Sequence, residues 1–315
     1  MCTAITYRNN DFYFGRTLDN EHSFGEEVVL TPRNYSFAFT NGRHLASHYA
    51  IIGMACVKED YPLYFDAMNE KGLCMAGLNF VGNAFFRSPE DGYDNVAVYE
   101  FIPWLLSQCE SVQDARLMLE KINLTDTPFN DDLPTTQLHW LLADRNQSVT
   151  IECMRDGLHI HNNPVGVLTN NPPFPFQLQN LNNFLHLSAK KPENKFSAEL
   201  DFDIYSKGLG ALGLPGDWSS QSRFVRAAFV KMNADTDENE ALEQFFHILG
   251  SVNQVKGCTV TDDGCEYTVY TSCMNADKGI YHFTSYNNRS ITSVDMNKAD
   301  IDSRALIIFS NHNKI

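Results

Sequence analysis

The chain contains no block of basic residues, and its acidic residues outnumber the basic ones. Among 315 residues, 24 are Lys or Arg and 39 are Asp or Glu, which gives a formal net charge of −15. Phosphate backbones and anionic membrane surfaces are both bound through clustered Lys and Arg side chains. The charge therefore predicts no nucleic-acid partner and no membrane partner, and it is typical of a chain that stays dissolved in a crowded cell.

Long apolar runs and linkers are also missing. No segment approaches the ~18 apolar residues that a membrane-spanning helix needs. The first residues, MCTAITYRNNDFYFG, lack the basic and then apolar regions of a secretion signal, so we expect a cytoplasmic chain. Hydrophobic residues make up 43% of the chain, enough for a large core, and no Pro/Ser-rich linker interrupts it. We therefore expect one domain over residues 1–315.

The cysteines form no metal-binding or disulfide framework. The eight cysteines include no C-x-x-C pair and no tight cluster, which favours reduced thiols. His159 and His161 form an H-x-H pair without a third ligand at metal-binding spacing, and alternation along a strand accounts for them. The sequence predicts no metal and no cofactor.

Four pairs of β-rich segments are each joined by a polar turn, which is typical of antiparallel hairpins. The pairs are Cys2–Tyr7 with Phe12–Thr17, Leu63–Met68 with Leu73–Phe80, Leu138–Asp144 with Val149–Met154, and Tyr267–Asn275 with Ile280–Tyr286. Helical patterns fall between these pairs, from Ser111 to about Lys121, from Ser219 or Ser220 to Met232, and from Asp237 to about Gly250. This order predicts an α+β fold of antiparallel sheets covered by helices.

The least regular stretch runs from Asn170 to Gly216 and is rich in Asn, Pro and Gly. We interpret it as an ordered excursion, because it carries large apolar residues that we expect to be buried: Phe174, Phe176, Phe184, Leu185 and Leu187.

Cys2 is the residue whose position is most informative about possible chemistry. Removal of Met1 would leave a free α-amine on the residue that also carries a thiol. An α-amine titrates near ~8, so much of it can act as a base near neutral pH, and a thiolate is a strong nucleophile. The alternative is that Cys2 is an ordinary buried strand residue.

The first hairpin brings further groups toward Cys2. If its turn centres between Asn9 and Asn10, Cys2 lies near Thr17, and Arg16 and Asp19 come within reach. An aspartate can orient a protonated amine, and an arginine can favour a thiolate. The alternative for these two charges is a solvated ion pair at a strand end.

Four blocks of sequence, in order along nearly the whole chain, resemble the choloylglycine hydrolase family. They are Met1–Thr3 with Phe14–Asp19, Tyr64–Leu73 with Ala76–Phe80, Asn163–Asn170, and Leu214–Asp217 with Ser222–Arg226. The resemblance implies a four-layer αββα sandwich, the N-terminal nucleophile hydrolase fold. It also implies hydrolysis of a linear, non-peptide C–N amide bond.

The same resemblance implies roles for individual residues. Cys2 would be the nucleophile, and its own α-amine the base. Arg16, Asp19 and Arg223 would order and polarise the thiol and the amine. The oxyanion hole would use the side-chain amide of Asn170 and the main-chain N–H of Asn79. Asn171 and Arg226 are the nearest rivals, and turn chemistry or a helix-surface position are the alternatives for these asparagines and arginines.

Within the family, the resemblance favours a bile salt hydrolase over a penicillin V acylase. The acylases tend to carry Tyr where this chain has Asn79, and the excursion also resembles the bile salt enzymes. The substrate would be a bile acid conjugated to glycine or taurine, and relatives are commonly homotetramers. Residues that could line its pocket, or simply pack in the core, are Leu18, Phe24, Phe129 and Leu133. A non-catalytic binding protein on the same fold is the alternative from another class.

Overall fold

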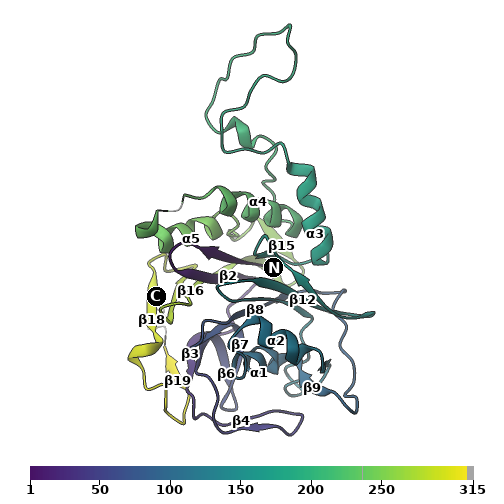
Figure 1. The fold of residues 1–315 in the computed structure, drawn as a ribbon, viewed down its shortest axis with the longest axis vertical. Coiled ribbons are helices and arrows are strands. Elements are labelled where there is room, and N and C mark those ends of the chain that lie inside the picture. Colours follow the sequence, from purple (N-terminus) through teal and green to yellow (C-terminus); the bar gives the residue numbers. More distant parts are fainter. Residues whose placement is uncertain (236, 311–315) are drawn as a thin grey trace.

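The structure is a computed structural model that describes residues 1–235 and 237–310. Two large antiparallel sheets are stacked on each other, and helices cover the outer face of each sheet. From top to bottom in Figure 1 the layers are helices α4 and α5, a seven-stranded sheet, an eight-stranded sheet, and helices α1 and α2. This arrangement confirms the αββα sandwich predicted from the sequence.

The seven-stranded sheet contains the N-terminal strand near its edge. Strand β15 (Thr259–Thr261) pairs with β16 at one side. The other strands follow the order β14 (Val167–Leu168), β1 (Cys2–Arg8), β2 (Phe12–Asn20), β16 (Gly264–Asn275), β17 (Ile280–Ser285) and β18 (Thr292–Asp295).

The eight-stranded sheet faces it across the larger hydrophobic core. Its order is β13 (Gly157–Asn162), β12 (Ser148–Met154), β11 (Leu138–Ala143), β8 (Cys74–Asn79), β7 (Tyr61–Asn69), β6 (Ile51–Lys58), β3 (Glu27–Thr31) and β19 (Ile307–Phe309). Two small sheets pair β9 (Asp94–Ala97) with β10 (Ile122–Thr125) and β4 (Phe37–Ala38) with β5 (His44–Leu45). All four predicted hairpins are confirmed, as β1–β2, β7–β8, β11–β12 and β16–β17.

Two of the three predicted helices begin directly after a serine that the sequence analysis named, and one of these serines makes a capping hydrogen bond. Helix α2 (Val112–Leu119) starts after Ser111, whose side chain accepts a hydrogen bond from the main chain, and α4 (Ser220–Asn233) starts after Ser219. The third predicted helix begins later than expected. Asp237 caps a short 3-10 turn, η4 (Glu238–Glu240), and α5 (Ala241–Gly250) follows it.

Further helical segments lie outside the predicted set. They are α1 (Phe101–Leu106), α3 (Phe174–Asn180) and the 3-10 turns η1 (Val98–Glu100), η2 (Leu181–Phe184), η3 (Leu209–Ala211) and η5 (Met296–Lys298). Helix α1 is buried all round, so it has no amphipathic period for a sequence pattern to reveal. Among the described residues, no helix is long and apolar enough to cross a membrane.

Strand β2 is buried along almost its whole length, because the second sheet covers one face and helix α5 the other. Only Asn20, its last residue, is partly exposed. The polar residues Arg16, Thr17 and Asp19 are therefore held in the interior, where each needs a partner. The burial of β2 therefore places these three polar side chains in the interior beside the first strand.

The segment after α3 leaves the body of the protein as a long arm, residues 185–214, which projects at the top of Figure 1. The expected burial of large apolar residues here is right for Phe174 but wrong for Phe176 and Leu185, which are 61% and 82% exposed. Phe184 and Leu187 are partly buried. Among the described residues, no sheet or helix of the body lies over the arm (Figure 1). Its other largely exposed apolar residues are Phe196, Leu200, Phe202, Tyr205 and Leu212.

Candidate active site

The first hairpin fixes what lies opposite Cys2. Its turn contains the three residues Asn9 to Asp11, because Arg8 pairs with Phe12, so it centres on Asn10 rather than between Asn9 and Asn10 as the sequence analysis assumed. The register is therefore shifted by one, and Cys2 lies opposite Leu18 instead of Thr17. The shift places Arg16 opposite Ala4, and the main chain of Asp19 hydrogen-bonds to Met1.

Cys2 is buried, and each of its polar atoms has a partner from a different part of the chain. Its Sγ accepts a hydrogen bond from Nη2 of Arg16. Its main-chain nitrogen donates to Oδ1 of Asn170 at 2.9 Å. Its carbonyl oxygen accepts from Nη1 of Arg223 at 2.6 Å. Three of the predicted site residues thus touch Cys2 directly.

Arg16 is a buried cation that reaches the thiol from the neighbouring strand. Its Nη1 also donates to the carbonyl of Gly77 at 2.5 Å, which ties β2 to the facing sheet. Burial alone would lower the pKa of Arg16, but the nearby Cys2, Tyr270 and Asp66, together with Asp19, outweigh it and raise the pKa. The guanidinium stays charged, and a fixed positive charge beside a sulfur atom stabilises the thiolate form.

Asp19 lies beside the N-terminus without touching the thiol. Its carboxylate accepts hydrogen bonds from the hydroxyls of Thr268 at 2.6 Å and Thr17 at 3.1 Å. Its carbonyl oxygen accepts from the α-amine of Met1 at 2.7 Å, and the same amine forms an ion pair with Glu266. Burial lowers the pKa of this amine, while Cys2 and Asp19 oppose that shift.

The two rival arginines of α4 lie in different surroundings. Arg223 is fully buried, and its guanidinium donates to Cys2, to Thr3 Oγ1 and to Asn170 Oδ1, the last two at 2.7 Å. Arg226 is only partly buried, and it donates to the carbonyls of Ser251, Pro215 and Asp217. Arg223 is therefore the arginine that α4 brings to Cys2.

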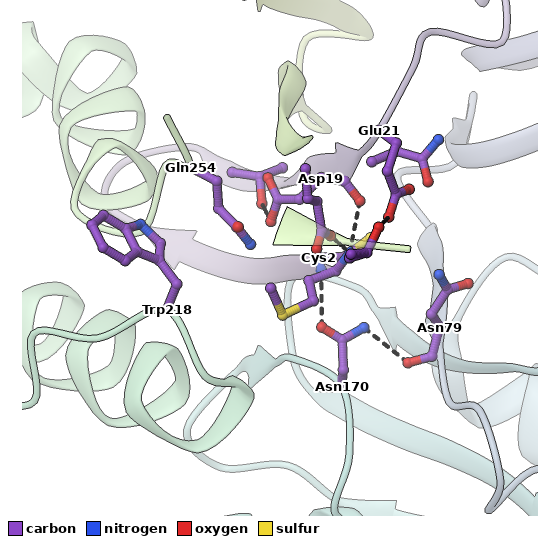
Figure 2. Close-up of polar contacts among 12 residues, drawn as sticks. Cys2, Asp19, Glu21, Asn79, Asn170, Trp218 and Gln254 are labelled. Atoms are coloured by element: carbon purple, nitrogen blue, oxygen red, sulfur yellow. Dashed lines mark hydrogen bonds and ion pairs between the residues drawn. The ribbon is translucent and has the colours of Figure 1, made fainter. Parts of the chain in front are cut away.

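The two rival asparagines, Asn170 and Asn171, also lie in different surroundings. Figure 2 shows Asn170 hydrogen-bonded to both Cys2 and Asn79, and its Nδ2 donates to the carbonyl of Asn79 at 2.8 Å. Asn171 points elsewhere, because its Nδ2 donates to the carbonyl of Val81 and its Oδ1 accepts from Asn83. Since a side-chain amide has two N–H donors, one hydrogen of Asn170 Nδ2 is still available in this arrangement.

A cavity of about 460 Å³ opens beside Cys2. Its wall is mainly apolar, and it includes the four pocket residues named from the sequence, Leu18, Phe24, Phe129 and Leu133. Phe24 stacks on Phe65 with ring centroids 5.6 Å apart, and Phe129 meets Tyr99 edge-to-face at 5.1 Å. A hollow of about 640 Å³ at the far end of β1 includes neither Cys2 nor any other predicted site residue.

His159 and His161 lie on β13 with parallel rings 5.8 Å apart, as strand alternation predicts. His159 pairs with Asp156 at 3.0 Å, and His161 lies 3.5 Å from Glu152. In the described part of the chain, no three His, Cys, Asp or Glu side chains are grouped so that they could hold a metal ion.

Comparison with known proteins decides the family. The model of the linear amide C–N hydrolases, choloylglycine hydrolase family, matches residues 2–309. The chain belongs to the choloylglycine hydrolase family. It is 51% identical over 312 residues to the bile salt hydrolase/transferase of Lactiplantibacillus plantarum, covering 98% of this chain and 96% of that protein.

Solved structures agree with this membership. The crystal structure of the C2A mutant of the conjugated bile acid hydrolase from Clostridium perfringens, 35% identical to this chain, superposes with a TM-score of 0.91 over 98% of this chain and 96% of the other. Penicillin V acylase from Agrobacterium tumefaciens, 21% identical, superposes with a TM-score of 0.79 over 98% and 91% of the two chains. The second likeness shows the shared fold alone.

Several residues around Cys2 were not found from the sequence. Ser220 donates through its hydroxyl to Thr169 and accepts from the main chain of Asn170, and Gln177 donates to the carbonyl of Asn170. Glu266 and Gln254 lie near the N-terminus, and the buried side-chain oxygen and nitrogen of Gln254 have no hydrogen-bond partner among the described residues. These residues are far from Cys2 in the sequence and share no motif with it, so only the fold reveals them.

Proposed function

We propose that the chain hydrolyses the amide bond of bile acids conjugated to glycine or taurine, with Cys2 as the nucleophile. The observation that carries the proposal is the position of Cys2. Its sulfur lies against a buried arginine, at the wall of a mainly apolar cavity. An enzyme that cleaves an amide between an apolar body and a small polar amine needs this combination of reactive group and pocket.

The reaction first requires removal of Met1, which frees the α-amine of Cys2. That amine is the base, because it belongs to the residue that carries the thiol. The surroundings favour its neutral form, since burial lowers the pKa of the α-amine of Met1, three bonds away. Asn170 Oδ1, which accepts from the nitrogen of Cys2, orients the amine toward the sulfur.

Acylation begins when the thiol gives its proton to the α-amine. The sulfur forms a bond to the amide carbon, and the carbonyl electron pair moves to oxygen. The second N–H of Asn170 Nδ2 and the main-chain N–H of Asn79 stabilise this oxyanion, each such donor contributing about 3 kcal/mol. The C–N bond then breaks, and the leaving glycine or taurine takes the proton from the α-ammonium group.

Deacylation repeats the proton transfers with water. The α-amine takes a proton from water, and the oxygen attacks the thioester carbon. The C–S bond breaks, the free bile acid leaves, and the sulfur regains its proton. Arg16 and Asp19 keep the charges around the sulfur and the amine balanced in both steps, and Arg223 holds the Cys2 carbonyl in place.

The cavity suits a steroid. A rigid apolar body gains about 25 cal/mol for each Å² that it buries, and it loses little conformational entropy on binding. Leu18, Phe129 and Leu133 would contact the steroid, while Phe24, which is 45% exposed, would cover it at the mouth.

The test compares kcat/KM for glycocholate, taurocholate and penicillin V in one buffer. We expect the two bile salts to be hydrolysed far better than penicillin V. Equal or greater efficiency with penicillin V would overturn the bile salt assignment while leaving the amide hydrolase intact. If the chain processed to Cys2 hydrolyses none of the three substrates, both the bile salt assignment and the amide hydrolase activity are overturned.

We also propose that four copies assemble through the arm, as a homotetramer. The arm carries large apolar side chains in water, with Phe196 82% and Tyr205 86% exposed, and exposed apolar patches of this kind mark protein contacts. A second copy of the chain is the partner that is always present at matching concentration. A cytoplasmic location and a single domain stay predictions from the sequence.

Sedimentation of the wild type and of a Phe196→Ser, Tyr205→Ser double variant tests the assembly. We expect the wild type to sediment as a tetramer and the double variant as a smaller species. Leu117→Ser, which changes an exposed apolar residue on α2, is the matched control and should stay tetrameric. A monomeric wild type would overturn the proposal.

A further inference from the structure

A buried histidine and a buried glutamate lie together behind the candidate oxyanion site. His139 of β11 and Glu152 of β12 are both completely buried, and Nδ1 of the histidine lies 3.1 Å from Oε1 of the glutamate. Burying ionisable groups is costly unless they are paired and hydrogen-bonded. Neither residue touches Cys2, so a direct contact with the nucleophile does not explain why two ionisable groups are buried here.

The pair holds both ends of the loop that contains Asn170. Nε2 of His139 lies 2.8 Å from the carbonyl oxygen of Thr169, and Oε1 of Glu152 accepts from the main-chain nitrogen of Phe174 at 2.9 Å. A carbonyl oxygen can only accept, so Nε2 carries a hydrogen and donates it. The main chain is thus fixed immediately before Asn170 and four residues after it.

The other face of His139 meets the second candidate donor segment. The ring of Phe80 stacks on His139 with centroids 4.2 Å apart and planes 7° from parallel. Phe80 directly follows Asn79, whose carbonyl accepts the hydrogen bond from Asn170. One imidazole therefore contacts the chain neighbours of both proposed oxyanion donors, which come from β8 of the eight-stranded sheet and from the loop after β14 of the seven-stranded sheet.

The side of Glu152 that faces away from His139 has fewer hydrogen bonds. Oε2 of Glu152 is buried and has no hydrogen-bond partner in the part of the chain that the structure describes, and Nε2 of His161 lies 3.5 Å away from it. On the inner side, Oε1 of Glu152 accepts from the main-chain nitrogen of Phe174 and is hydrogen-bonded to Nδ1 of His139. Together, His139 and Glu152 hold the main chain of this loop at both ends.

We propose that His139 and Glu152 are positioning residues that set the distance between Asn79 and Asn170. The inference rests on the proposed oxyanion role of those two asparagines. Without the imidazole, the Thr169 carbonyl loses its donor and Phe80 loses its stacking partner. The N–H groups then no longer converge on one point, although Cys2 and Arg16 keep their contact.

The experiment measures kcat, KM and the rate of Cys2 alkylation by iodoacetamide. In His139→Phe, which keeps a ring for Phe80 but no donor, we expect kcat to fall roughly 10- to 100-fold, because small displacements of catalytic groups have effects of this size. KM and the alkylation rate should change less than about twofold, since oxyanion contacts act in the transition state only. His139→Gln, which restores a donor toward Thr169, should recover part of kcat.

The control is His282→Phe. His282 of β17 is also a buried histidine with a hydrogen-bonded ring, but its partner is Ser293. It should lose stability and keep kcat. If both His139 variants fold and keep the wild-type kcat, the inference is wrong. It is also wrong if the His139 variants and His282→Phe all lose kcat and alkylation rate to the same extent. A wild type inactive on all amides would instead overturn the proposed hydrolysis and this inference with it, so the two failures are distinguishable.

Discussion

Oδ1 of Asn170 accepts a hydrogen bond from the main-chain nitrogen of Cys2 at 2.9 Å, and the same oxygen accepts from Arg223 at 2.7 Å. Two donors on one oxygen fix which end of the amide faces Cys2. Nδ2 must then point the other way, toward the carbonyl of Asn79 (Figure 2). The amide therefore joins the proposed base to the proposed oxyanion site.

Replacing Asn170 with Ala should remove both functions of that amide. Because an oxyanion donor is worth on the order of 10²- to 10³-fold in kcat, we expect a loss of at least this size. Asn171→Ala is the matched control, since this neighbour bonds to Val81 and Asn83 instead and should keep its kcat. Steady-state rates on glycocholate check the pair. If Asn171→Ala were inactive and Asn170→Ala active, the choice between the two asparagines would be wrong.

Much of the architecture was predictable because it is local. Hairpins with polar turns and helices with serine caps are encoded within about ten residues, and the structure contains them. The register of the first hairpin was not predictable, since a two-residue and a three-residue turn fit the same Asn-rich sequence. Helix α1 was not predictable either, because it is covered on all sides and therefore lacks an amphipathic period.

The site shows the same division. Cys2, Arg16 and Asp19 lie within one hairpin, so pattern and resemblance together brought them into consideration. Ser220, Glu152 and His139 come from three other elements, and only the stacking of the sheets brings them near the loop of Asn170. The prediction was wrong at the start of the arm, where Leu185 was expected to be buried and is 82% exposed. The position of an arm relative to the body is set by the fold and not by local sequence.

Arg223→Ala and Arg226→Ala should separate kinetics from stability. Each arginine donates to several oxygen atoms that are left without this donor after truncation, so both variants should have a lower Tm. Only Arg223 bonds to Cys2 and Asn170, so only Arg223→Ala should lose most of its kcat. Measurements well below both Tm values check this. Equal kcat in the two variants would contradict the proposed role of Arg223.

The N-terminus gives a covalent test. An intact mass of active protein should correspond to a chain that begins at Cys2, because the proposed base is a free α-amine. A chain with an extension before Cys2 that cannot be removed should fold with an unchanged Tm and have no turnover. The same extension ending in a protease site restores activity after cleavage. Full activity with Met1 retained would exclude the α-amine as the base.

His282 should make the protein sensitive to acid independently of catalysis. Burial lowers the pKa of His282 to about 4 from an ordinary value of 6.5, and Glu243 only partly opposes the shift. The folded state thus keeps this imidazole neutral, whereas the unfolded state binds a proton once the pH falls below 6.5. Because the unfolded state binds more protons, stability decreases as the pH falls from 6.5 to about 4 and levels off below that.

The contribution of this one group is about 3 kcal/mol of unfolding free energy over that window. His282→Asn keeps a polar atom for the hydroxyl of Ser293, which bonds to Nδ1 at 2.7 Å, but it cannot titrate. We expect the variant to be less stable than the wild type at neutral pH and to lose less stability on acidification. Denaturant unfolding at fixed protein concentration across the window measures both curves. Parallel curves would show that His282 is protonated as easily in the folded chain as in the unfolded one, because only a lowered pKa makes the two diverge.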